Sequence, residues 1–121
     1  MKPTISVDNE HAIVTTRFAP DMTLDEIQEF LTELKTTVDD FGDRGATFSI
    51  LNDAADKSFE NLDAQRELSL ELRKILAGAN LDRYAIFRPQ GDYRSDEEDK
   101  HPDRMKTFVT LEEANAWLFR K

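Results

Sequence analysis

The sequence predicts a small α/β fold, with helices packed on a mixed, mostly parallel sheet that begins with an antiparallel hairpin. Two short stretches rich in β-branched residues flank a polar turn near the N-terminus. Further apolar stretches are separated by segments whose apolar residues recur every three or four positions. Strands joined through single helices lie parallel, with right-handed crossovers. We therefore expect the order ββαβαβ(α)βα, with residues 1–121 forming a single domain.

The first half of the chain contains the clearest helix signal. Residues 4–7 and 12–16 are the predicted strands of the hairpin. Thr23 and Glu26 form a capping box, in which the two side chains satisfy free amides at a helix start. One apolar stripe follows the cap: Leu24, Ile27, Phe30, Leu31, Leu34 and Val38. Gly42 and Gly45 bracket the expected end of this helix.

The middle of the chain repeats the strand and helix pattern. Residues 46–51 form a predicted strand, and residues 52–61 form a polar loop that carries an aromatic residue. A second helix is expected at residues 62–76, ended by Gly78 or Asn80. Residues 84–87 form the next predicted strand, and the turn 88–92 follows it.

The C-terminal part begins with the almost wholly polar stretch 93–104, where Ser95 and Glu98 allow a solvated helix without an apolar face. Residues 105–109 form a predicted edge strand. Thr110 and Glu113 then form another capping box, which opens a final helix. Its inward residues are expected to be Leu111, Ala114, Trp117 and Leu118.

Composition excludes several classes of function. The chain has 121 residues, a net charge of −9 and no cysteine. Nucleic acid binding needs a basic face, and this charge argues against it. Disulfides, thiolate catalysis and cysteine-based zinc sites are excluded. The N-terminal stretch lacks the apolar run of a signal peptide, so we expect a cytoplasmic protein that does not associate with membranes.

The chemistry-bearing residues do not form a recognisable catalytic set. His11 and His101 are the only histidines, and both stand among polar residues at expected surface positions. The acidic run 96–99 has neither calcium-loop spacing nor the glycine of a sharp turn, so it is interpreted as a solvated charge run. The glycines are scattered, without a phosphate-binding loop. We therefore expect no enzyme activity, no cofactor and no metal site.

The most informative predicted surface lies beyond the carboxyl ends of the parallel strands, where ligands collect in open α/β sheets. Arg88 is the expected anchor for a carboxylate or phosphate, unless it pairs with Asp53 or Asp56. Phe59 either offers a platform to a ligand or packs over the core. Leu70 lies off the main apolar stripe of its helix, so its exposure would indicate an interface. The candidate ligand or partner surface comprises Asn52, Asp53, Ser58, Phe59, Leu62, Leu70, Arg88 and Tyr93.

The segment 108–118, Phe-Val-Thr-Leu-Glu-Glu-Ala-Asn-Ala-Trp-Leu, carries a family resemblance. An edge strand followed by this helix start resembles the STAS superfamily, and more narrowly its SpoIIAA-like (STAS/SEC14-type) branch. The capped first helix and the strand that ends at Asn52 and Asp53 fit the same scheme. The resemblance implies the fold expected above, with Trp117 and Leu118 as core anchors.

Two positions depart from what the resemblance implies. Anti-sigma-factor antagonists of the superfamily carry a phosphorylatable serine in an Asp-Ser-Gly-like motif at a helix start. Here residues 60–64 read Glu-Asn-Leu-Asp-Ala, and Ser58 lies a few residues upstream. SpoIIAA-like relatives often place an amphipathic segment before the last strand, and here the acidic stretch 96–101 replaces it. A phosphorylation switch and membrane approach are therefore not expected.

Two functional hypotheses follow. The first is a non-enzymatic binding or regulatory module that offers the second helix and its preceding loop to a protein partner, with a homodimer as one form of that contact. The second is a carrier or binder of a small nonpolar or anionic molecule. A closed cavity lined by Phe18, Phe30, Phe59 and Phe87 would favour the carrier. A flat exposed patch over residues 62–72 would favour the protein partner.

Overall fold

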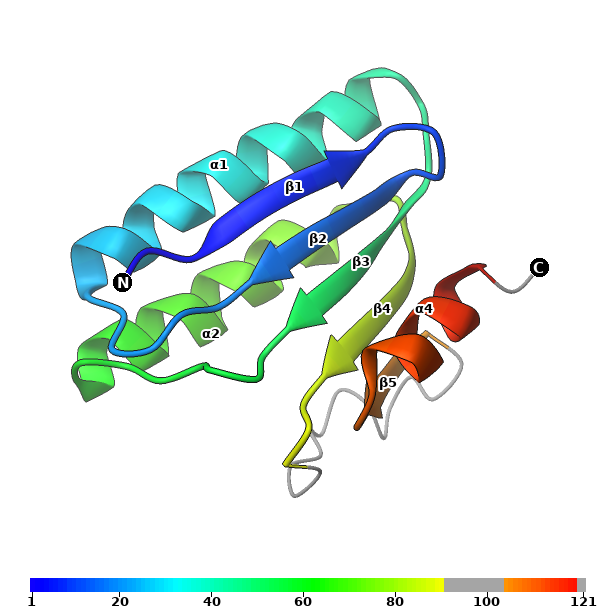
Figure 1. The fold of residues 1–121 in the computed structure, drawn as a ribbon. Helices are drawn as coiled ribbons and strands as arrows, with labels where there is room; N and C mark the ends of the chain where they lie inside the picture. Colours follow the sequence, from blue (N-terminus) through cyan, green and yellow to red (C-terminus); the bar gives the residue numbers. More distant parts are fainter. Residues whose placement is uncertain (91–103, 120–121) are drawn as a thin grey trace.

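Five strands form one sheet whose order in space follows their order along the chain (Figure 1). The computed structural model describes residues 1–90 and 104–119. The strands are β1 (Thr4–Asp8), β2 (Ile13–Arg17), β3 (Phe48–Asp53), β4 (Leu81–Phe87) and β5 (Met105–Phe108). β1 pairs with β2 in antiparallel fashion, and the pairs β2–β3, β3–β4 and β4–β5 are parallel. The predicted mixed sheet and its N-terminal hairpin are therefore confirmed.

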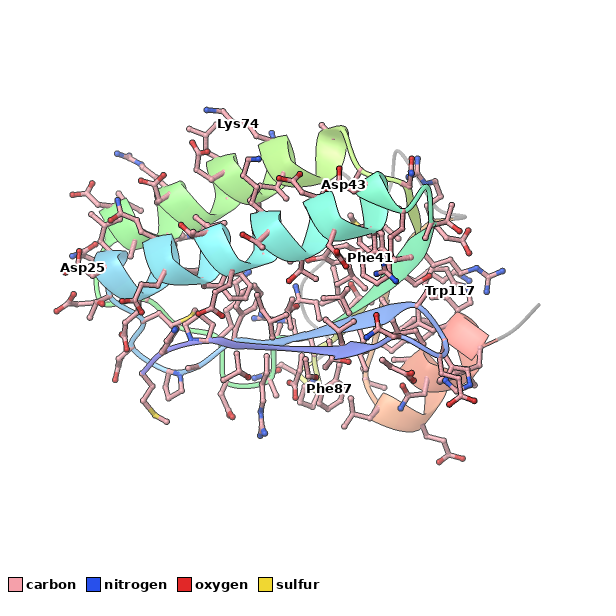
Figure 2. All side chains as sticks on the ribbon, turned by 90° about the horizontal axis from the view of Figure 1, so that it is seen from above. Asp25, Phe41, Asp43, Lys74, Phe87 and Trp117 are labelled. Carbon is pink, nitrogen blue, oxygen red and sulfur yellow. The ribbon has the colours of Figure 1, made fainter. Side chains whose placement is uncertain are left out.

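Helices cover both faces of the sheet, but unequally. The helices α1 (Leu24–Asp43) and α2 (Leu62–Ala77) lie side by side on one face (Figures 1 and 2). The shorter helix α4 (Leu111–Phe119) lies on the opposite face, over β3, β4 and β5. Figure 2 shows Phe41 between α1 and the sheet, and Phe87 on the other side of the sheet.

Alternating strand residues supply two separate apolar clusters. Val14, Ile50 and Tyr84 face α1 and α2, where they join the larger core. Their chain neighbours Ile13, Leu51 and Ala85 face α4 and pack with Ala114, Trp117 and Leu118. Successive side chains of a strand point to opposite faces, so one apolar run serves both layers. The expected inward positions Ala114, Trp117 and Leu118 are thus confirmed. The prediction for Leu111 was wrong, because this first residue of α4 is 42% exposed and does not join the cluster.

The start of α1 shows how local sequence sets this layer. The Thr23 side chain accepts a hydrogen bond from the Glu26 amide, and the Glu26 carboxylate accepts one from the Thr23 amide, so the predicted capping box is present. The helix ends at Asp43 with Arg44 as its C-cap, so its end lies between Gly42 and Gly45 as predicted. Gly45 makes the turn, since its φ of +65° suits a residue without a side chain.

Two strand boundaries also differ from the prediction. β3 continues through Asn52 and Asp53, which were expected to begin a loop. β4 begins at Leu81, three residues before the predicted start at Tyr84. The expected polar stretch 93–104 lies outside the described residues, apart from Arg104. In the described part of the chain, no helix is long and apolar enough to cross a membrane.

Candidate functional site

The loop that follows β3 closes against the segment that follows β2. The Met22 amide donates to the Ser58 carbonyl at 3.1 Å, and Met22 and Phe59 form an isolated bridge. The Ser58 hydroxyl accepts a hydrogen bond from the Asp21 amide at 2.7 Å. Ser58 therefore has a structural role, because it holds two loops together at the carboxyl edge of the sheet.

The loop that follows β3 also contacts the chain that leaves β4. The Ala54 amide donates to the Phe87 carbonyl at 2.9 Å, which extends the β3–β4 pairing by one step. The Gln90 side chain donates to the Ala55 carbonyl at 2.9 Å. The segments that follow β2, β3 and β4 are thus joined along the carboxyl edge of the sheet. We call this edge the rim, and it lies where the sequence predicted a binding surface.

Asn52 lies beneath this rim, in the core, and does not line a surface. Its side-chain amide donates to the Tyr84 hydroxyl at 2.8 Å, and both residues are at most 5% exposed. The Asn52 Oδ1 atom has no hydrogen-bond partner among the described residues. Burial raises the pKa of Tyr84 to about 12, because the apolar core disfavours a phenolate. This polar pair contributes to the core rather than to recognition.

Asp53 lies on the opposite face of the sheet from Asn52. Its Oδ2 atom is 3.7 Å from the Arg17 Nε atom, and its Oδ1 atom accepts from the Ala55 amide at 3.1 Å. Arg17 occupies the neighbouring position on β2, so this ion pair follows directly from the parallel register. Asp53 therefore forms its ion pair with Arg17, whereas the sequence suggested Arg88.

Lys57 is a cation at the rim that the sequence reasoning did not single out. Its Nζ atom lies 5.0 Å from the centre of the Phe18 ring and 5.8 Å from the centre of the Phe59 ring. Phe59 is partly buried and packs on the larger core, so it covers the core and supports the lysine. Burial lowers the pKa of Lys57 below its ordinary 10.5, and the charge of Arg88 lowers it further.

The outward side of α2 carries exposed leucines. Leu62 is 55% exposed and Leu70 is 56% exposed, as expected for positions off the buried stripe. Arg66 and Arg73 are exposed on the same side of the helix, because the four positions lie within one quarter of its circumference. We call Leu62, Arg66, Leu70 and Arg73 the α2 ridge.

Two hollows in the described part of the chain lie away from the four phenylalanines of the predicted carrier cavity. One is a groove between α1 and α2, bordered by Leu31, Lys35 and Glu71, among others. The other lies near the end of α4, beside Ser49 and Arg83. Phe18, Phe30 and Phe59 belong to the larger core, where Phe18 and Phe30 pack edge to face at 5.5 Å, whereas Phe87 lies on the other side of the sheet (Figure 2), so the four phenylalanines do not line one cavity.

A cluster of possible metal ligands at the hairpin turn has a local explanation. Ligand atoms of Asp8, Glu10 and His11 lie within 4.8 Å of one another, and all three residues are exposed. The Asp8 Oδ1 atom accepts from the Glu10 and His11 amides, and its Oδ2 atom is 2.8 Å from the His11 ring. The carboxylate therefore shapes the turn, and this hydrogen bonding lowers the pKa of Asp8.

The structure separates the predicted site residues into three groups. Ser58, Phe59 and Arg88 lie at the rim, while Asn52 and Asp53 point away from it to opposite faces. Leu62 and Leu70 lie on the outward side of α2. Tyr93 lies outside the described residues.

The sequence analysis did not include Lys57, Arg66 or Arg73 among the candidate surface residues, although the sequence held a signal for each. Lys57 is the only basic residue in the stretch 52–61. Arg66 and Arg73 recur at helical spacing with Leu62 and Leu70.

No family model matches this chain, and no curated protein matches it. Among solved structures, an uncharacterized DUF3478-family protein from Shewanella loihica PV-4, described as having a SpoIIAA-like fold, is 17% identical. It aligns with a TM-score of 0.64 over 96% of this chain and 91% of its own.

The anti-sigma factor antagonist SpoIIAA in its unphosphorylated form is 13% identical. Its TM-score is 0.60, over 98% of this chain and 99% of its own. Both alignments span nearly all of both chains, and they agree with the observed strand order and helix layers. The chain therefore has a SpoIIAA-like fold, as the segment 108–118 had indicated.

Proposed function

We propose that this protein is a non-enzymatic, cytoplasmic regulatory module that binds an acidic protein partner through the α2 ridge. The observation that carries the proposal is the pair of leucines on that ridge, each more than half exposed on a helix whose other side is buried. Leu62 and Leu70 lie two turns apart on the same side of α2, and apolar side chains gathered on one exposed face are typical of surfaces that another protein covers.

The chemistry of the ridge suggests the chemistry of its partner. Fully burying a leucine side chain contributes about 1.5–3 kcal/mol, so Leu62 and Leu70 would supply the apolar part of the binding energy. Arg66 and Arg73 have no ion-pair partner among the described residues, and arginines pair well with carboxylates across an interface. Two cations beside two apolar side chains fit a partner surface that combines carboxylates with an apolar centre.

The neighbouring helix has a different character. The exposed side of α1 carries Asp25, Glu29 and Glu33, and Figure 2 shows Asp25 and Asp43 near the two ends of the helix. An acidic partner would be repelled by α1 and attracted by the α2 ridge. This contrast would orient the partner over α2.

The shared fold supports a regulatory role. One protein with this fold, SpoIIAA, is named an anti-sigma factor antagonist, and such a name describes a protein that regulates another protein. We propose that the present chain acts without a phosphorylation switch at the start of α2. Residues 60–64 contain no serine, and the Ser58 hydroxyl accepts a hydrogen bond from Asp21 within the fold.

Site-specific crosslinking tests the proposal. A photoreactive amino acid placed at Leu70 should capture a partner in cells, while the same group at the exposed Thr36 of α1 should not. The captured protein is then purified and its affinity measured by calorimetry. Leu70→Glu should weaken binding at least tenfold, Arg66→Glu should weaken it less, and Thr36→Glu should leave it unchanged.

Other results would overturn the proposal. Equal affinity of the purified partner for wild type and Leu70→Glu would remove the α2 ridge from the interface. A dimer that Leu70→Glu dissociates in sedimentation velocity would replace the acidic partner by a second copy of the chain. A discrete small molecule that co-purifies in native mass spectrometry and is lost on organic extraction would favour the carrier instead.

A further inference from the structure

The strand β1 forms one edge of the sheet, and β2 is its only neighbouring strand (Figure 1). All of its residues except Ile5 are exposed. Natural proteins commonly block such an edge with a charge or a proline. Here Pro3 precedes the strand and Asp8 ends it, so the central residues 5–7 carry neither device.

The hydrogen bonds between β2 and β3 show which backbone groups of β2 face each neighbour. The Ala12 carbonyl accepts from the Ser49 amide at 2.9 Å, and the Phe18 amide donates to the Asp53 carbonyl at 3.0 Å. Successive residues of a strand direct their N–H and C=O groups alternately to its two sides, so the even-numbered residues of β2 face β3. Its odd-numbered residues therefore face β1.

The antiparallel register then assigns the backbone groups of β1. Thr4, Ser6 and Asp8 lie opposite the odd-numbered residues of β2, with which they form the hydrogen-bonded pairs. The N–H and C=O groups of Ile5 and Val7 consequently point to the free edge. No hydrogen bond joins them to a helix or loop in the described part of the chain, so they can pair with an added strand.

The side chains at this edge are partly apolar. Ile5 and Val7 point to the α1 side of the sheet, because Ile5 packs on the larger core and Val7 is paired with the core residue Val14. Val7 nevertheless remains 40% exposed. An added strand would cover it with a cross-strand neighbour, and β-branched residues suit this position.

Carboxylates of α1 lie beside the same edge. The Lys2 ammonium, just before β1, is 3.3 Å from a Glu29 oxygen and 2.8 Å from a Glu33 oxygen, and all three side chains are exposed. These contacts place both glutamates on the β1 side of α1. One lysine does not neutralise two carboxylates, so this edge favours a basic partner, whereas a second copy would bring the acidic sides of two α1 helices together.

We infer that the free edge of β1 binds an extended basic segment of a protein partner, which adds to the sheet as an antiparallel sixth strand. Main-chain hydrogen bonds to Ile5 and Val7 supply affinity, and contacts with alternate side chains supply specificity. Glu29 and Glu33 select for lysine or arginine in the added strand. The surface lies on the β1 side of α1, away from α2, so it is separate from the α2 ridge and does not depend on the proposed function (Figure 1).

The peptide Lys-Thr-Val-Thr-Val-Thr-Lys, blocked at both ends, is the probe. Its valines and lysines share one face, so they can meet Val7 and the α1 glutamates together. In hydrogen exchange followed by NMR, the amides of Ile5 and Val7 should exchange rapidly in the free protein and at least tenfold more slowly at saturating peptide. The Ser6 amide, which donates to β2, should exchange slowly in both states.

Two methylated peptides form a matched pair. Methyl groups on both valine nitrogens, which must donate to β1, should weaken binding at least tenfold. A methyl group on the central threonine nitrogen, which points away from β1, should leave binding nearly unchanged.

Protein variants test the same contacts. Val7→Pro removes an outward donor and should weaken binding at least tenfold, and Val7→Lys should also weaken it by repelling the basic peptide. Glu29→Gln should weaken it about twofold to fivefold, the effect of one exposed ion pair. Leu70→Glu, which disrupts the α2 ridge, should leave it unchanged.

Equal binding of the two methylated peptides would overturn the inference, as would equal binding by wild type and well-folded variants of Val7. Slow exchange at Ile5 and Val7 in the free protein would show that the edge is not open. A wild-type dimer in sedimentation velocity that Val7→Lys dissociates would assign the edge to a second copy of the chain instead.

Discussion

The helices α1 and α2 lie in the same layer but use their apolar residues differently. α1 buries six residues against the sheet: Ile27, Phe30, Leu31, Leu34, Val38 and Phe41. α2 fully buries only Ala64 and Leu68, while Leu72, Ile75 and Leu76 are half-buried. Two further leucines of α2 face solvent on the ridge.

This difference separates folding from recognition. Apolar residues of α1 contribute mainly to stability, because they are removed from water on folding. The leucines of the α2 ridge contribute little to stability and remain available for a partner. Substitutions in the two helices should therefore differ strongly in their effect on the free energy of unfolding, which the following predictions test.

The largest effect is expected for Phe30→Ala in α1. Phe30 is fully buried and packs edge to face against Phe18, so its removal leaves a cavity in the larger core. The free energy of unfolding should fall by about 3–5 kcal/mol, measured by urea denaturation. A loss below about 1 kcal/mol would contradict the view that the buried residues of α1 contribute mainly to stability.

The buried polar pair in the core beneath the helices gives the next largest effect, and it depends on pH. The folded state keeps Tyr84 neutral up to a pKa of about 12, whereas the unfolded state ionises near 10.0. The stability contributed by the neutral phenol is therefore fully present below pH 10 and is lost as the pH rises through 12. The loss should reach about 3 kcal/mol, from about 1.4 kcal/mol for each pKa unit.

Tyr84→Phe isolates this contribution. At neutral pH the variant should lose about 1–3 kcal/mol, because the Asn52 amide no longer has its acceptor. Its stability should then fall less steeply than that of the wild type between pH 10 and 12 in urea titrations. Parallel curves for the two proteins would contradict a buried neutral Tyr84.

The helix starts allow a direct comparison of α1 with α2. The Asn61 side chain accepts from the Ala64 amide at 3.0 Å, while Thr23 shares its cap with the Glu26 carboxylate. Asn61→Ala and Thr23→Ala should each lower the free energy of unfolding by about 1 kcal/mol. Asn61→Asp should retain the stability of α2, since aspartate caps equally well. Thermal unfolding followed by circular dichroism measures these differences.

The smallest effect is expected for Leu70→Ala on the α2 ridge. Leu70 is 56% exposed, and alanine is at least as favourable in a helix, so the change should be within about 0.5 kcal/mol. The same urea measurement as for Phe30→Ala provides the contrast between the two helices. A loss above about 1.5 kcal/mol would place Leu70 in the folding core and weaken the proposed function.

Local sequence patterns predicted most of the fold, and the errors of that prediction have a physical cause. The capping box at Thr23 and the stripe behind it involve residues close in sequence, so they were visible. Asn52 looked like a loop residue because an amide is costly in a sheet core without a partner. Its partner Tyr84 lies on the next strand, and only the folded register brings the two together.

The candidate site was predictable only in part, for a similar reason. The exposure of Leu70 followed from its position off the helical stripe. The sequence could not show that the Ser58 hydroxyl accepts from Asp21, or that Lys57 lies over Phe18, since these contacts join two different loops. Contacts between strand ends depend on topology, and local composition does not encode them.

The sheet order β1-β2-β3-β4-β5 has a consequence for synthesis on the ribosome. Each strand pairs with the strand made immediately before it, so no strand must wait for a distant partner. The hairpin, α1 and β3 can assemble while the rest of the chain is still being translated, and each later strand adds to an existing edge. Vectorial assembly of this kind limits the time during which an unpaired apolar strand is exposed to other nascent chains.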